Sequence, residues 1–100
     1  GIGCSGNMCG ALTGAVMAMS LHTGTADPAD QTAKRQLYRN VHRLTEEYKL
    51  RTGSTICRDL MGFDMSTPEG QKMAKVPGAF DRCDDFVRIA AEILEEMLAQ

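Results

Sequence analysis

The chain has 100 residues, of which 43% are hydrophobic and 24% charged, and its formal net charge is −2. These values predict one helical domain over residues 1–100, too short for two cores and too apolar for a disordered chain. Scattered basic residues exclude a nucleic-acid footprint. No apolar run approaches the ~20 residues of a membrane helix. Because no secretory signal is visible, we expect a cytoplasmic location.

Small residues mark the first predicted helix, Met8 to Leu21. They recur three and four positions apart on one face, at Gly10, Ala11, Gly14, Ala15 and Ala18. Each glycine costs a helix about 1 kcal/mol relative to alanine. We therefore expect another backbone to pack closely on this face, either within the chain or in a homodimer.

The second predicted helix has clear start and stop signals. Asp27 is an N-cap candidate and Pro28 fits the first helical position. Gly53 supplies the stop signal. Apolar residues between them keep helical spacing, which predicts one buried stripe: Ala33, Leu37, Val41, Leu44 and Tyr48.

Three further helices follow. Ser54 is the predicted cap of a short helix, Thr55 to Met61, and Ser66-Thr67-Pro68-Glu69 opens another to about Lys75. The last runs from Asp81 to Leu98 with a predicted buried stripe of Phe86, Val87, Ala90, Ile93, Leu94 and Met97. No stretch alternates with period two, so the prediction is all-α: a small helical bundle with two longer helices, a small-residue helix and short connecting helices. The seven methionines are interpreted as core filler.

The four cysteines, Cys4, Cys9, Cys57 and Cys83, carry the chemical signal. The last three follow the expected caps Asn7, Ser54 and Asp81 by two or three residues, which places each in the first turn of a helix. That position favours anions and lowers the pKa of a thiol. Arg58 and Arg82 follow and precede two of the cysteines in sequence, and their positive charge is also expected to lower the pKa of a thiol. We therefore predict a site of reactive or metal-binding thiolates, with Cys4 in the glycine-rich loop as a further candidate.

Other interpretations remain open. Free cysteines are often inert core residues, and disulfides would require an oxidising compartment. His22 and His42 lack partners at ligand spacing and are interpreted as surface residues.

Three ordered motifs resemble the C_GCAxxG_C_C family of redox-active proteins. Cys9-Gly10-Ala11-Leu12-Thr13-Gly14 is similar to its signature, and residues 53–62 and 64–70 are similar to the segments that follow. Cys83 lies where the family has its last cysteine. The family is helical and resembles the non-haem part of split-Soret cytochromes. Its members have an upstream helix with another cysteine, and the resemblance implies that this chain begins after that helix.

The resemblance implies a redox role in which Cys9, Cys57 and Cys83 bind an iron–sulfur cluster, such as a two-iron cluster, for electron transfer. Cys4 or an exogenous group would complete the site. Zinc is the second choice, and covalent haem is not expected because Cys-x-x-Cys-His is absent. One alternative is a metal-free thiol–disulfide oxidoreductase with Cys57 or Cys9 as the attacking thiolate. Another is a helical assembly module with inert cysteines. No electron partner is identifiable, and enzymatic activity is left open.

Overall fold

The computed structural model describes residues 1–100 and contains five α-helices, one 3₁₀ helix and no strand, which confirms the all-α prediction. The elements are η1 (Ile2–Cys4), α1 (Gly10–Thr23), α2 (Gln31–Thr52), α3 (Cys57–Met61), α4 (Pro68–Ala74) and α5 (Asp81–Leu98). α2 and α5 are the two longer helices, α1 is the small-residue helix, and α3 and α4 are the short connectors.

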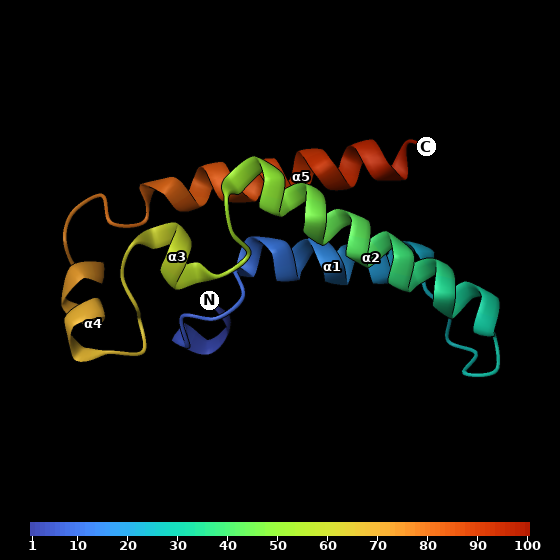
Figure 1. Ribbon diagram of the computed structural model, residues 1–100, viewed down its shortest axis with the longest axis horizontal. Helices are drawn as coiled ribbons and strands as arrows, with labels where there is room; N and C mark the ends of the chain where they lie inside the picture. The colour runs from blue at the N-terminus through green and yellow to red at the C-terminus, as the bar shows by residue number, and fades with distance from the viewer.

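Three helices build the core (Figure 1). α1 packs against α2 and α5, which also pack against each other. The core is formed by Cys9, Leu12, Ala15, Leu44, Tyr48, Leu60, Phe86, Ala90 and Ile93. The molecule measures 47 × 25 × 17 Å. α3, α4 and the N-terminal segment lie at one end of it, and the first half of α2 projects at the other end.

Three helix starts differ from the predictions, those of α1, α2 and α3. α1 begins at Gly10, so its N-cap is Cys9 itself. α2 begins at Gln31 because the Asp30 carboxylate accepts the Ala33 N–H, whereas Asp27 accepts the Ala29 N–H in the preceding turn. The last helix has the bounds predicted for it, and Gly53 ends α2 in the left-handed conformation.

The start of α3 is set by the N-terminal segment rather than by Ser54. The Ser54 hydroxyl accepts the Ile56 N–H and donates to Asp59, so the helix N-cap is Ile56. The first two amides of the helix, those of Cys57 and Arg58, donate to carbonyls of the N-terminal segment, at 2.6 and 3.1 Å. This pairing fixes residues 6–9 beside residues 55–58.

The predicted close packing of the small-residue face is absent from the chain. Gly10 and Gly14 are exposed, and a Cβ added at either would meet nothing within 4 Å. Val87 of α5, predicted to be buried, is 57% exposed beside this face. The methionine prediction also fails at two positions, since Met17 and Met73 are exposed while Met19 is buried. The face is therefore open at Gly10 and Gly14, although Ala15 on the same face is buried in the core.

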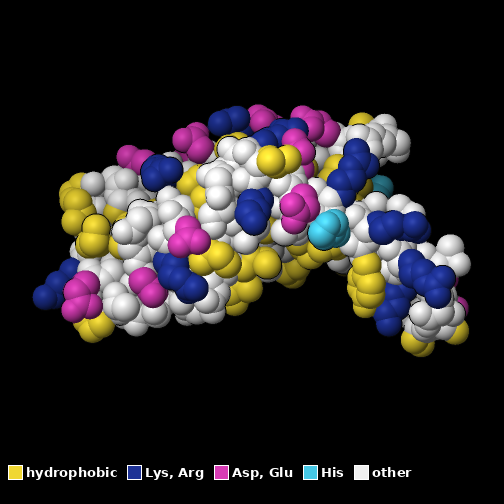
Figure 2. All heavy atoms as spheres, viewed as in Figure 1, with side chains coloured by type: hydrophobic (Ala, Val, Ile, Leu, Met, Phe, Trp, Pro, Cys, Tyr) yellow, Lys and Arg dark blue, Asp and Glu magenta, His cyan; other side chains and the backbone are white.

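Figure 2 shows how side chains are distributed on one side of the molecule. Basic side chains gather on the projecting first half of α2, where Lys34, Arg35 and Arg39 are exposed, and Arg43 is exposed just beyond it. Acidic side chains line the edge formed by α5. None of the helices is long and apolar enough to span a membrane.

Candidate cysteine site

The structure places Cys9, Cys57 and Cys83 on the wall of one cavity of about 190 Å³. Cys9 precedes α1, Cys57 is the first residue of α3, and Cys83 is the third residue of α5. Each of the three predicted helix starts therefore contributes one thiol. The remaining wall is apolar or glycine, without a charged side chain: Gly1, Gly10, Ala11, Leu60, Met61, Phe86 and Val87.

Backbone pairing explains why Cys9 and Cys57 meet. The Cys9 N–H donates to the Thr55 carbonyl at 2.8 Å, and the Cys57 N–H donates to the Asn7 carbonyl at 2.6 Å. Arg58 reinforces the pairing because its guanidinium donates to the Asn7 side chain at 3.0 Å. The packing of α5 on α1 then brings Cys83 to the same cavity.

Cys4 lies apart from these three thiols. It is exposed at the end of η1, with a left-handed backbone (φ 57°), and it does not line the cavity. The structure thus brings together three of the four candidate residues. Their role as ligands stays a prediction, as does that of Cys4.

The local electrostatics differ from the prediction of lowered thiol pKa values. Burial raises the pKa of Cys83, and the neighbouring Cys9 and Cys57 raise it further when they are charged. The helix amides are already used, since the Cys83 N–H donates to the Phe80 carbonyl. Arg82 does not compensate, because its guanidinium lies over the Phe86 ring, 5.7 Å from the centroid. The prediction was therefore wrong for Cys83.

Two residues of the site were missed at the sequence level. The Tyr48 hydroxyl, fully buried, donates a hydrogen bond to the Cys9 sulfur at 3.1 Å. Burial raises the pKa of Tyr48, as do this hydrogen bond and the negative charges of the three thiolates. Met61, interpreted as core filler, has its sulfur 3.6 Å from the Cys83 sulfur. The available signal for Tyr48 was its position on a buried stripe, where a hydroxyl needs a partner.

The potential metal donors of this cavity are all sulfur atoms, which are soft ligands. Three thiols and one thioether surround an apolar cavity, which is the chemistry that suits iron–sulfur, zinc or copper(I) rather than magnesium or calcium. However, no group of three or more Cys, His, Asp or Glu side chains is arranged to hold a metal ion. The sulfurs line the wall of the cavity instead of converging on one point.

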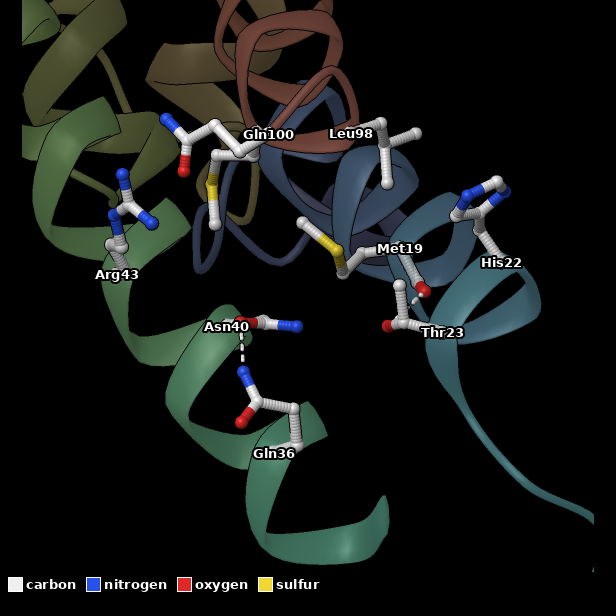
Figure 3. Close-up of a pocket in the computed structure, with 9 residues that line it drawn as sticks. Met19, His22, Thr23, Gln36, Asn40, Arg43, Leu98 and Gln100 are labelled. Atoms are coloured by element: carbon white, nitrogen blue, oxygen red, sulfur yellow. Dashed lines mark hydrogen bonds between the residues drawn. The ribbon is translucent and has the colours of Figure 1, made fainter.

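Among the other hollows of the molecule, one adjoins this site and another shares no residue with it. An apolar groove of about 350 Å³ between α1 and α5 shares Gly10, Ala11 and Val87 with the cysteine cavity and continues it along the small-residue face. Figure 3 shows the second hollow, where α1, α2 and the end of α5 diverge. Its labelled residues include His22, Asn40 and Arg43, and it contains no cysteine. Neither hollow offers thiol chemistry of its own.

Comparison with protein families matches residues 1–97 to the family described as "Putative redox-active protein (C_GCAxxG_C_C)". Searches of curated proteins and of solved structures give no significant match. The match includes all four cysteines and both segments that pair around Cys9 and Cys57.

Proposed function

Since the chain belongs to the C_GCAxxG_C_C family of redox-active proteins, we propose that Cys9, Cys57 and Cys83 supply three thiolate ligands to an iron–sulfur centre that carries electrons. The single observation that carries the proposal is that these three thiols line one apolar cavity. When bound, such a centre accepts and releases one electron without requiring a bond to change in the protein.

The size and chemistry of the cavity support a cluster over a single ion. A zinc ion needs four donors at about 2.0–2.3 Å from one point, whereas the three thiols here line a space of about 190 Å³. A cluster of iron and inorganic sulfide is larger than one ion, so its cysteine ligands need not all lie around a single point. Leu60, Phe86 and the rest of the apolar wall would limit the access of water to it.

The thiol electrostatics also favour a positively charged occupant. The thiolates of Cys9 and Cys57 oppose ionisation of Cys83, and the amino group of Gly1, which lowers the pKa of Cys83, offsets them only in part. Iron supplies that positive charge and stabilises all three thiolates together. Without metal, the raised pKa of Cys83 weakens it as an attacking thiolate, which leaves that role in the thiol–disulfide alternative to Cys57 or Cys9.

The test is the iron and acid-labile sulfide content of protein purified anaerobically, or reconstituted with iron and sulfide. We expect the wild type to be coloured, and Cys9→Ser, Cys57→Ser and Cys83→Ser each to lose most of the iron. Cys4→Ser is the matched control because Cys4 is exposed and outside the cavity. Retention of iron in this control would also place the fourth ligand elsewhere than Cys4.

Two results would contradict the proposal. One is a wild-type protein that takes up neither iron nor sulfide; the other is three cavity variants that bind as much iron as Cys4→Ser does. Far-UV circular dichroism of each variant checks that lost iron does not reflect a lost fold. If no iron binds, mass analysis after mild oxidation tests the thiol–disulfide alternative, which predicts a disulfide within the cavity.

A further inference from the structure

The three cavity thiols differ in their hydrogen-bond partners. The Cys9 sulfur accepts a hydrogen bond from the Tyr48 hydroxyl, with 3.1 Å between oxygen and sulfur. The Cys83 thiol donates to the Met61 thioether, with 3.6 Å between the sulfurs. Neither contact was predicted from the sequence, and the two have opposite chemical consequences.

The Tyr48 contact stabilises a thiolate. A hydroxyl that donates to sulfur binds the charged form more strongly than the neutral form. The raised pKa of Tyr48 keeps this proton in place across the physiological range. Because Tyr48 is fully buried, water does not replace its hydrogen bond.

The Met61 contact stabilises a thiol instead. A thioether is only a weak acceptor and has no proton to give, so it offers nothing to a Cys83 thiolate. Burial opposes that thiolate as well. Of these two contacts, only the one from Tyr48 therefore supplies a donor to a cavity sulfur.

We infer that Tyr48 is a positioning residue that holds the Cys9 sulfur through this hydrogen bond and raises the reduction potential of the centre bound there. This inference rests on the proposed function. A donor to a ligand sulfur withdraws negative charge from the centre, and that favours the reduced form, which carries one more electron. Tyr48 thereby acts through Cys9 without touching the metal.

The first test compares Tyr48→Phe with the wild type after reconstitution with iron and sulfide. The variant keeps the ring in the core and removes only the hydroxyl. We expect equal iron content and a more negative midpoint potential, so that at the wild-type midpoint the reduced-to-oxidised ratio falls on the order of tenfold. Tyr38→Phe is the matched control, because Tyr38 is on the same helix and 61% exposed. An unchanged potential in Tyr48→Phe would overturn the inference.

A second measurement uses metal-free protein and separates the inference from the proposed function. The rate of iodoacetamide alkylation at Cys9 is measured relative to Cys57 and Cys83 by peptide mass spectrometry. Loss of the donor should slow Cys9 alone by about threefold or more, because the thiolate is the nucleophile. A merely loosened core would accelerate all three thiols. An unchanged ratio would contradict the role of Tyr48 even if no iron binds.

If Tyr48→Phe does not fold, 3-fluorotyrosine incorporated into the Tyr38→Phe background gives the opposite perturbation. Fluorine makes the hydroxyl a stronger donor while preserving its position. The midpoint potential should then shift in the positive direction. A negative shift or no shift would overturn the inference.

Discussion

At the residue scale, the placement of the cysteines was predictable but their electrostatics were not. Caps and spacing indicated that three thiols lie at helix starts, and the structure places them on one cavity. The predicted benefit of a helix start requires unused amides. Here the N–H groups of Cys57 and Arg58 donate to the N-terminal segment, 50 residues or more away in sequence. Such long-range pairing leaves no local signal.

Tyr48 and Cys83 predict how stability depends on pH in the metal-free, reduced protein. Both have pKa values raised by burial, so the folded state holds their protons to higher pH than the unfolded state does. The free energy of unfolding should therefore be constant below the ordinary pKa of a thiol and fall as pH rises above it. Each such group contributes a slope of up to about 1.4 kcal/mol per pH unit.

Urea unfolding at several values between about pH 7 and about pH 10 measures this slope. Cys83→Ala should flatten the fall in stability over this range, Tyr48→Phe should have little effect below about pH 10, where an unfolded tyrosine begins to ionise, and Cys4→Ser should leave the fall unchanged. Stability that rises toward alkaline pH would show that these groups are not buried as described.

At the element scale, the helices were predicted well and the way they meet was predicted poorly. Each predicted helix is present, and α5 has its predicted bounds because its amphipathic stripe is long and regular. The small-residue face of α1 was expected to be covered, yet it lines an open groove. Helical periodicity identifies which residues share a face, but it does not identify the partner of that face.

Gly14→Ala tests whether the groove is open in solution. A Cβ at Gly14 meets nothing within 4 Å, so alanine should stabilise α1 through helix propensity alone, by up to about 1 kcal/mol. Gly70→Ala is the contrasting variant, because its Cβ would collide with the Asp64 carbonyl. Thermal unfolding measures both. A loss of stability in Gly14→Ala would indicate that a second copy covers the face, as the homodimer prediction requires.

Gly6 tests the pairing that brings Cys9 to Cys57. It is buried at φ 74°, and a Cβ would collide with the Asp64 carboxylate. Gly3 has a similar positive φ of 57° but open space around it. We expect Gly3→Ala to cost about 1 kcal/mol from backbone strain, and Gly6→Ala to cost at least about 1 kcal/mol more. Equal losses in denaturant unfolding would mean that the contact at Gly6 does not fix the segment.

At the scale of the whole molecule, the site lies at one end of an elongated bundle. The cysteine cavity is formed where the N-terminal segment, α3 and the start of α5 meet, and the basic half of α2 projects at the opposite end. The apolar groove continues from the cavity along α1 and α5. The helical spacing alone predicted neither the separation of these features nor the cavity, because both depend on how three helices cross.

The central claim is that three of the four cysteines hold one centre, and the most direct test measures all four thiols together. Native protein, with and without reconstituted iron and sulfide, is alkylated for increasing times and analysed peptide by peptide. Without the centre, Cys4 should react first because it alone is exposed. With the centre, Cys9, Cys57 and Cys83 should become slower by at least about tenfold while Cys4 keeps its rate. The claim would be contradicted if any of the three cavity thiols were alkylated as fast with the centre as without it. It would also be contradicted if Cys4 were slowed as much as they are.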